Sequence, residues 1–214
     1  MVVMSRSYTV QPVQYKKSDR YHRRVSSSRE RILDSFETAL IRDGERAATM
    51  EAVAAAADVS KGGLLYHFPS KEALVDGLAG RLKALAEKDR EGMTDSPDGA
   101  ARYYVRTSVF EDSALDRALV SMARLAQQGH PTARAALAEI QERWLDALEG
   151  QLGDRTTARA VKLLGDGLYY DAAFFASADS GREQPTDIDE LLAVVDLIVA
   201  ARTHPSPAIE ETST

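Results

Sequence analysis

A short segment in the first third of the chain combines residue types that suit contact with a phosphate backbone. Residues 61–67 have the sequence Lys-Gly-Gly-Leu-Leu-Tyr-His and lie between the turn Asp58-Val59-Ser60 and the break at Pro69. Lysine, tyrosine and histidine side chains can donate hydrogen bonds to phosphate oxygens, and glycine lets a backbone approach a partner closely. A helix of this composition is poorly suited to a core, so the pattern favours a surface that binds DNA.

The residues in and around this segment have different expected roles. Lys61 is placed to reach a guanine edge or a phosphate, and Lys71 adds a charge at the start of the next helix. Leu65 cannot form hydrogen bonds, so it either contacts a thymine methyl group or faces the core. Tyr66 and His67 are expected to donate to phosphates, with capping of its own helix as the alternative for His67. The candidate DNA contacts are Thr49, Ser60, Lys61, Gly62, Gly63, Leu65, Tyr66, His67 and Lys71.

Four helices are needed to position these residues. Apolar residues at spacings of three and four predict a first helix that begins at residue 29 and is capped by Ser28. Thr49 is the expected N-cap of a second helix, and Ser60 that of a third. Ser70 begins a fourth helix that continues to about residue 91. Residues 29–75 therefore predict a helix-turn-helix DNA-binding domain.

The remainder of the chain has the periodicity of further helices and no strand pattern. The predicted fold class is all-α, with a three-helix DNA-binding head at residues 29–75 and a larger helical domain at 76–202. Residues 1–28 are expected to form a flexible basic arm, and residues 203–214 a disordered tail. The additional helices are expected at residues 99–111, 114–128, 131–150, 155–178 and 187–202.

Charge and composition narrow the class of protein. The net charge is −6, but residues 1–75 contain 12 Lys and Arg against 9 Asp and Glu, whereas residues 76–214 contain 15 against 24. A basic end of this kind is typical of a protein that presents one end to nucleic acid. The absence of cysteine excludes disulfides, thiolate metal sites and a cysteine nucleophile.

Other signals that would indicate an enzyme or a membrane protein are missing from the sequence. The four histidines are scattered, with no Glu-x-x-His pair and no phosphate-binding glycine loop, so we expect no enzyme activity, cofactor or metal. No apolar run is long enough to cross a membrane, and the N-terminus lacks the apolar stretch of a secretory signal. The sequence therefore predicts a cytoplasmic protein without a membrane partner.

Three motifs follow one another within residues 29–75: Thr49-Met50-Glu51-Ala52-Val53-Ala54, then Val59-Ser60-Lys61-Gly62, then Tyr66-His67-Phe68-Pro69-Ser70-Lys71-Glu72-Ala73-Leu74. In these motifs the chain resembles the TetR family of bacterial transcriptional regulators. It departs from the family pattern at Leu65, where Tyr is common, and at Asp58, where Gly is common. Asp tolerates left-handed backbone better than most residues, so the turn is still expected to form.

The resemblance implies a homodimeric regulator, usually a repressor, that binds a palindromic double-stranded DNA operator. It also implies that residues 76–202 bind a small-molecule effector and that the helices at 155–178 and 187–202 form the dimer surface. The alternative is a DNA-binding regulator or architectural factor without small-molecule control. A cavity in the second domain would favour the first function, and a solid core would favour the second.

Aromatic and polar side chains in the second domain are candidates for an effector site, although any one of them more often belongs to a core. Asp166 and Asp171 are the carboxylates of interest on the helix at 155–178. Asp171 is expected to be buried and to need a partner, either a ligand amine or an arginine such as Arg106 or Arg159. The expected ligand-binding residues are Tyr104, Arg106, Phe110, Met122, Trp144, Leu148, Tyr170 and Phe174.

Overall fold

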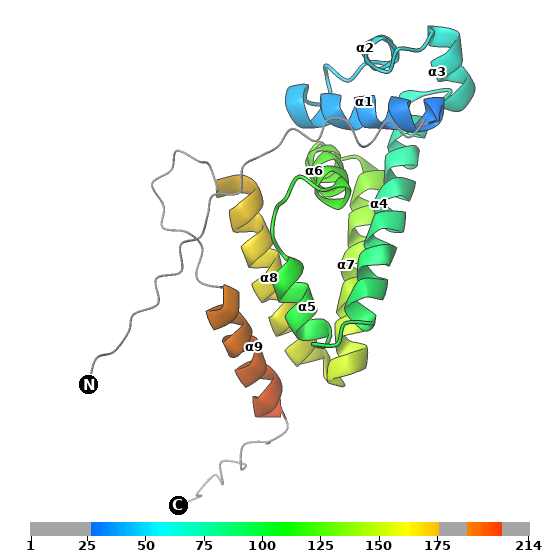
Figure 1. Cartoon of the computed structure of the whole chain (residues 1–214). Coiled ribbons are helices and arrows are strands. Elements are labelled where there is room, and N and C mark those ends of the chain that lie inside the picture. The colour runs from blue at the N-terminus through cyan, green and yellow to red at the C-terminus, as the bar shows by residue number, and fades with distance from the viewer. Residues whose placement is uncertain (1–26, 176–187, 203–214) are drawn as a thin grey trace, which may run out of the picture.

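The computed structural model describes residues 27–175 and 188–202, which form nine α-helices and contain no β-strand (Figure 1). This confirms the predicted all-α fold class. The predicted tail, and all but the last two residues of the predicted arm, lie outside the described residues. The helices are α1 (Ser28–Asp43), α2 (Met50–Ala56), α3 (Lys61–His67), α4 (Lys71–Thr94), α5 (Ala100–Thr107), α6 (Ala114–Gln127), α7 (Pro131–Leu152), α8 (Arg155–Phe175) and α9 (Ile188–Arg202).

Hydroxyl side chains cap the helices at the N-terminal end of the chain. Thr49 accepts a hydrogen bond from the backbone N–H of Ala52, and Ser60 accepts one from that of Gly63. Each cap stabilises its helix by about 1 kcal/mol. These two predicted caps are confirmed, but the cap predicted at Ser28 is wrong by one residue. Ser27 accepts the hydrogen bond at the start of α1, and the sequence does not identify it as the cap because it is one of three consecutive serines at residues 26–28.

The turn between α2 and α3 depends on a residue in left-handed backbone. Asp58 has a φ of 51°, as the sequence analysis expected for this turn. Its neighbour Ala57 is buried, and Val59 packs against the core on the other side of the turn. The turn therefore sets the angle at which α3 leaves α2.

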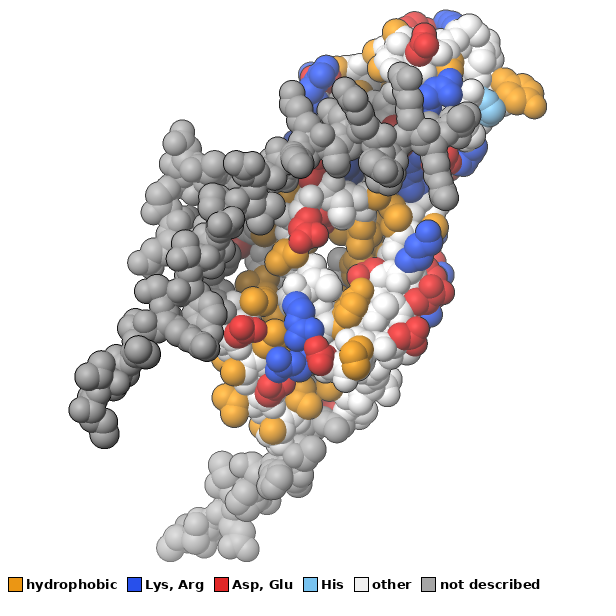
Figure 2. Space-filling model, in the orientation of Figure 1, with side chains coloured by type: hydrophobic (Ala, Val, Ile, Leu, Met, Phe, Trp, Pro, Cys, Tyr) orange, Lys and Arg blue, Asp and Glu red, His pale blue; other side chains and the backbone are white. Residues whose placement is uncertain are grey.

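The helices form a head and a body (Figures 1 and 2). The head consists of α1 to α3 and the start of α4, and the body consists of the rest of α4 and α5 to α9. Figure 1 shows α1 lying across one end of the body, next to α6, while α4 continues from the head and runs beside α7. Since α4 is a single helix of 24 residues, it connects the two parts rigidly.

One helix is shorter than the sequence predicted. The helix expected at 99–111 ends at Thr107, because Ser108 leaves helical backbone and Asp112 adopts a φ of 55°. Ser113 and Asp116 then form a capping box that begins α6. The residues between α5 and α6 thus form a connector at the edge of the body.

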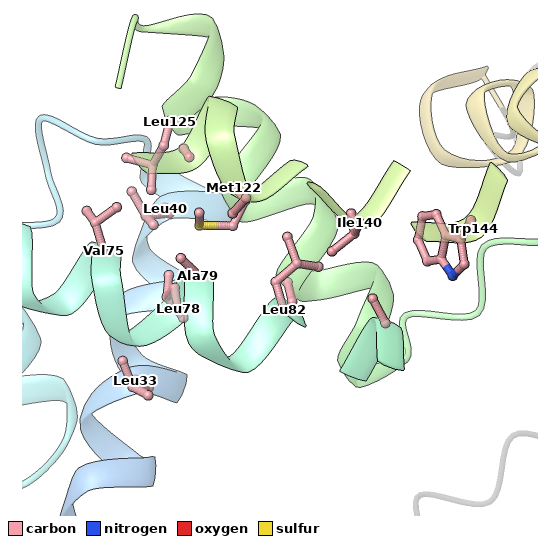
Figure 3. Packing of buried hydrophobic residues seen from close by; sticks show 14 of the residues in the cluster. Leu33, Leu40, Val75, Leu78, Ala79, Leu82, Met122, Leu125, Ile140 and Trp144 are labelled. Carbon is pink, nitrogen blue, oxygen red and sulfur yellow. The ribbon is translucent and has the colours of Figure 1, made fainter. Parts of the chain in front are cut away.

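One hydrophobic core continues from the head into the body (Figure 3). Leu40 of α1 lies beside Leu125 and Met122 of α6, and Leu78 and Leu82 of α4 point into the same layer. These side chains are fully buried, and each burial stabilises the fold by about 1.5–3 kcal/mol. Because α1 packs on both α4 and α6, the orientation of the head depends on those two helices.

Candidate DNA-binding surface and effector cavity

The surface of α3 projects from the free end of the head. Tyr66 is 86% exposed and Leu65 is 41% exposed, whereas Leu64 between α3 and the core is completely buried. Leu65 therefore faces solvent and not the core, which were the two positions that the sequence left open for it. Gly62 and Gly63 add no side chain to this surface, so a partner could approach the backbone closely.

Lys61 lies on the same surface and is held by an acidic partner. Its Nζ is 2.8 Å from a carboxylate oxygen of Glu51, and both side chains are about two-thirds exposed. The hydrogen bond raises the pKa of Lys61, so its ammonium stays charged. Exposed pairs of this kind contribute little to stability, so Lys61 is available to exchange its carboxylate for a phosphate.

Lys71 has a more structural setting than the sequence suggested. Its Nζ donates a hydrogen bond of 2.8 Å to the backbone carbonyl of Glu45 and lies 3.3 Å from the carboxylate of the same residue. Its side chain is only 31% exposed. Lys71 therefore ties the start of α4 to the loop between α1 and α2, and its predicted phosphate contact remains a prediction.

His67 and Thr49 complete the candidate contacts around α3. The half-buried ring of His67 meets the ring of Tyr66 edge to face at 5.1 Å. Phe68 is buried behind them, with the guanidinium of Arg29 over its ring at 5.1 Å. Thr49 is exposed at the start of α2. The predicted contacts on α2 and α3 thus lie at the end of the head that is far from the body (Figure 1), and their contact with DNA remains a prediction.

A cavity of about 340 Å³ opens in the body between α4, α5, α6, α7 and α8. Figure 2 shows the body hollowed on this face, with hydrophobic side chains around the hollow. Four aromatic residues contribute to its wall: Tyr104, Trp144, Tyr169 and Tyr170. The size is within the range of small-molecule sites.

The predicted ligand-binding residues fall into three groups. Tyr104, Trp144 and Tyr170 line the cavity, and Phe110 packs edge to face on the lining ring of Tyr169 at 6.3 Å. The side chain of Phe174 lies outside the described residues. Three residues do not line the cavity: Met122 and Leu148 are completely buried in the core, and Arg106 is exposed and paired with Asp98. Their contact with a ligand stays a prediction that this cavity does not support.

Polar side chains form a network along one side of the cavity. The hydroxyl of Tyr104 donates a hydrogen bond of 2.7 Å to Asp166, and the ammonium of Lys162 lies 2.6 Å from the other oxygen of that carboxylate. Lys162 is only 8% exposed and also donates to Gln141. Burial and the nearby Asp166 raise the pKa of Tyr104 far above its usual value, so its hydroxyl remains a donor.

Asp171 does not have the buried position that the sequence suggested. It is exposed on α8, so it does not need the arginine partner that was expected. The carboxylate that does have buried partners is Asp166, one turn earlier on the same helix. Periodicity alone did not distinguish between the two faces of α8.

Sequence reasoning missed several polar residues at or beside the cavity, notably Asp89 of α4, Gln141 of α7 and Lys162 of α8. One signal for Asp89 was available, because Leu82, Ala86 and Met93 share its helical face at spacings of three and four. A carboxylate in such a buried stripe indicates either a partner or a site.

Charged residues join the head to the body at a cluster that we call the joint, formed by Glu30, Asp34, Glu37, Arg81 and Arg117. Arg81 of α4 lies 2.6 Å from Glu30 and 2.7 Å from Asp34, both on α1. Glu37 of α1 is buried and lies 3.5 Å from Arg117 of α6. Burial raises the pKa of Glu37, and the two arginines offset this effect only in part.

Within residues 27–175 and 188–202, no group of three His, Asp or Glu side chains is arranged to hold a metal ion. None of the helices in the same part of the chain is long and apolar enough to span a membrane.

Comparisons with known proteins agree with this architecture. Residues 32–78 match the model of bacterial regulatory proteins of the tetR family, and residues 98–196 match that of the tetracyclin repressor-like C-terminal domain. No curated protein sequence matches the chain.

Solved structures with a similar fold include the multidrug binding protein EbrR in complex with imidazole. The two chains are 22% identical with a TM-score of 0.58, and the alignment covers 87% of this chain and 99% of EbrR. SCO7518 from Streptomyces coelicolor A3(2) is 23% identical with a TM-score of 0.58, and the alignment covers 81% of this chain and 99% of SCO7518. GusR from Salmonella enterica is 18% identical with a TM-score of 0.57, and the alignment covers 82% of this chain and 93% of GusR. Identities this low support the shared fold alone.

Proposed function

The chain belongs to the TetR family of bacterial transcriptional regulators, and on this basis we propose that it is a homodimeric repressor which a small-molecule effector releases from a palindromic DNA operator. The observation that carries the proposal is the course of α4. This helix begins directly after α3 and, about five turns later, contributes Asp89 to the cavity wall. A protein that binds an operator must be in the same compartment as the bacterial chromosome, so the proposal includes a cytoplasmic location.

The exposed apolar residues support a dimer through the last two helices. Among the described residues, four of the eight exposed large hydrophobic side chains lie on α8 and α9: Leu163, Tyr170, Val194 and Leu197. Leu163 and Leu197 are 64% and 68% exposed. A two-fold axis at this face would cover them and would present two copies of α3 to a palindromic site.

Two helices support control by a ligand. Leu119 of α6 lines the cavity, while Arg117 and Arg124 of the same helix bond to Glu37 and to the carbonyl of Leu40 in α1. A ligand that moves α4 or α6 would therefore change the orientation of the head. In a dimer, the two copies of α3 would then no longer match successive major grooves, which lie about 34–36 Å apart. Such control needs different affinities of the ligand for the two states.

The presence of a cavity favours this function over DNA binding without small-molecule control. A solid body would have favoured the alternative, whereas this cavity has both apolar walls and convergent polar groups. The similar protein EbrR is described as a multidrug binding protein and has been solved with ethidium and with malachite green. This likeness supports the proposal that the cavity binds a small molecule.

The test is selection of bound fragments from genomic DNA by the full chain, followed by footprinting. We expect a specific protected site with two-fold symmetry and a complex of two chains per site. Lys88→Ala, which changes an exposed residue far along α4 from α3, serves as a control that should bind normally. Selection that enriches no sequence, at low salt and with fragments from the whole genome, would contradict the proposal.

A further inference from the structure

Asp89 is a carboxylate in the cavity wall that has no cationic partner. Its oxygen accepts a hydrogen bond of 3.2 Å from the hydroxyl of Tyr103, and none of the ion pairs in the described part of the chain includes it. The indole N–H of Trp144 also faces this carboxylate, but no hydrogen bond forms between them. Burial raises the pKa of Asp89, because the cost of burying its charge is offset by neutral hydrogen-bond donors and not by a cation.

The other two carboxylates in the wall are already satisfied. Asp116 accepts hydrogen bonds of 3.1 Å and 2.9 Å from the backbone N–H groups of Glu111 and Ser113. Asp166 has the Tyr104 hydroxyl and the Lys162 ammonium. Since no lysine or arginine among the described residues lines the cavity, its wall carries an excess of negative charge. Asp89 is the group that a ligand could neutralise.

Aromatic rings surround the same space. The side chain of Trp144 is only 5% exposed, and its ring meets that of Tyr104 edge to face with 6.1 Å between the ring centroids. Trp144 Nε1 and the Tyr169 hydroxyl are both buried without a hydrogen-bond partner among the described residues. Aromatic faces attract cations, and this attraction is strongest where water is excluded. The wall thus offers one uncompensated negative charge beside several aromatic rings.

We propose that the cavity binds a lipophilic organic cation of about the size of a substituted aromatic ammonium, with Asp89 as its counter-ion and Trp144 as part of its aromatic wall. An anion would meet three carboxylates, and a neutral molecule would leave the charge of Asp89 uncompensated. Because Asp89 belongs to α4, the cation would bind to the helix that carries the head. This inference rests on the proposed effector role of the same cavity.

The test uses two probes of the same shape that differ in charge, phenyltrimethylammonium and tert-butylbenzene. Calorimetric titration of the full chain without DNA should show that the cation binds about tenfold or more tightly than the neutral probe. The isosteric Asp89→Asn should abolish this preference. Asp98→Asn, which changes an exposed carboxylate paired with Arg106, should retain it. Thermal unfolding should show no loss of stability in Asp89→Asn, because the variant no longer buries a charge.

Three results would overturn the inference: no binding of the cation, equal affinity for the two probes, or a preference that persists in Asp89→Asn. The titration contains no DNA, so it does not depend on whether an operator exists. If the cation binds but leaves a protein–DNA complex intact, the cation site stands and the effector role in the proposed function fails.

Discussion

In the head, Tyr66 has 86% of its surface exposed, whereas in the body the ring of Trp144 has only 5%. Two of the candidate DNA contacts, Lys61 and Tyr66, are more than 60% exposed, and the partner of Lys61 is the exposed carboxylate of Glu51. The cavity, in contrast, is lined by groups that are largely bonded to one another, as Asp166 is to Tyr104 and Lys162. Changes at the exposed side chains of Lys61 and Tyr66 should therefore affect binding without affecting stability, whereas changes in the cavity wall should affect both.

The largest effect is expected at the proposed dimer surface on α8 and α9, which would bring a second copy of the head to the DNA. Leu197→Glu adds a charge to a residue that is 68% exposed in the single chain, so the monomer should fold normally. Operator affinity should fall by about 100-fold, because each half-site would bind separately. Sedimentation and DNA titration measure the two effects. Val109→Glu, at an exposed apolar residue outside α8 and α9, should leave both unchanged.

Gly165→Ala tests the packing of the cavity. A Cβ at this position would lie 2.7 Å from Ser108 Oγ and 2.7 Å from two ring atoms of Tyr104. We expect a loss of about 1–3 kcal/mol in the free energy of unfolding, together with weaker ligand binding. Gly167→Ala is the matched control, since nothing lies within 4 Å of its Cβ. Equal unfolding free energies for the two variants would contradict this account of the wall.

Gly77→Ala tests the corresponding contact in the head. Its Cβ would lie 2.8 Å from the ring of Phe68 and 3.0 Å from Leu33, where α3 and α1 pack on α4. The variant should lose about 1 kcal/mol of stability and bind DNA more weakly, since α3 must shift. Gly80→Ala on the same helix meets nothing within 4 Å and should instead gain about 0.5–1 kcal/mol. Denaturant titration separates these outcomes.

The smallest effect concerns Glu37, where head and body meet. Burial raises its pKa above 4.5, the ordinary value of a glutamate carboxyl, so the folded state favours the protonated form. The stability contribution of this group is therefore complete below that value and is lost as the pH rises through the folded pKa. The free energy of unfolding of the wild type, minus that of Glu37→Gln, should therefore decrease as the pH rises through this interval. A difference that increases with pH would show that the two arginines dominate instead.

The head was predictable because its signals are local. Thr49 and Ser60 act on backbone groups three residues away, and Asp58 acts through its own φ angle. Even there, three adjacent serines left the start of α1 uncertain by one residue.

The cavity was only partly predictable because it depends on which helix faces meet. Tyr104 and Trp144 were identified by residue type, but Leu148, one turn after Trp144 on the same stripe, belongs to the core. The network of Lys162, Gln141 and Asp166 brings together α7 and α8. Sequence periodicity gives each helix a buried side, but it does not say which buried residues border a space.

The most direct test of the central claim is the affinity of the full chain for its selected DNA site at two salt concentrations, beside the double variant Lys61→Ala, Tyr66→Ala. Both side chains are more than 60% exposed, so thermal stability should not change. The account predicts a loss of about tenfold or more in affinity and a weaker dependence on salt. Unchanged affinity and salt dependence in the double variant would contradict the assignment of α3 as the DNA-binding surface.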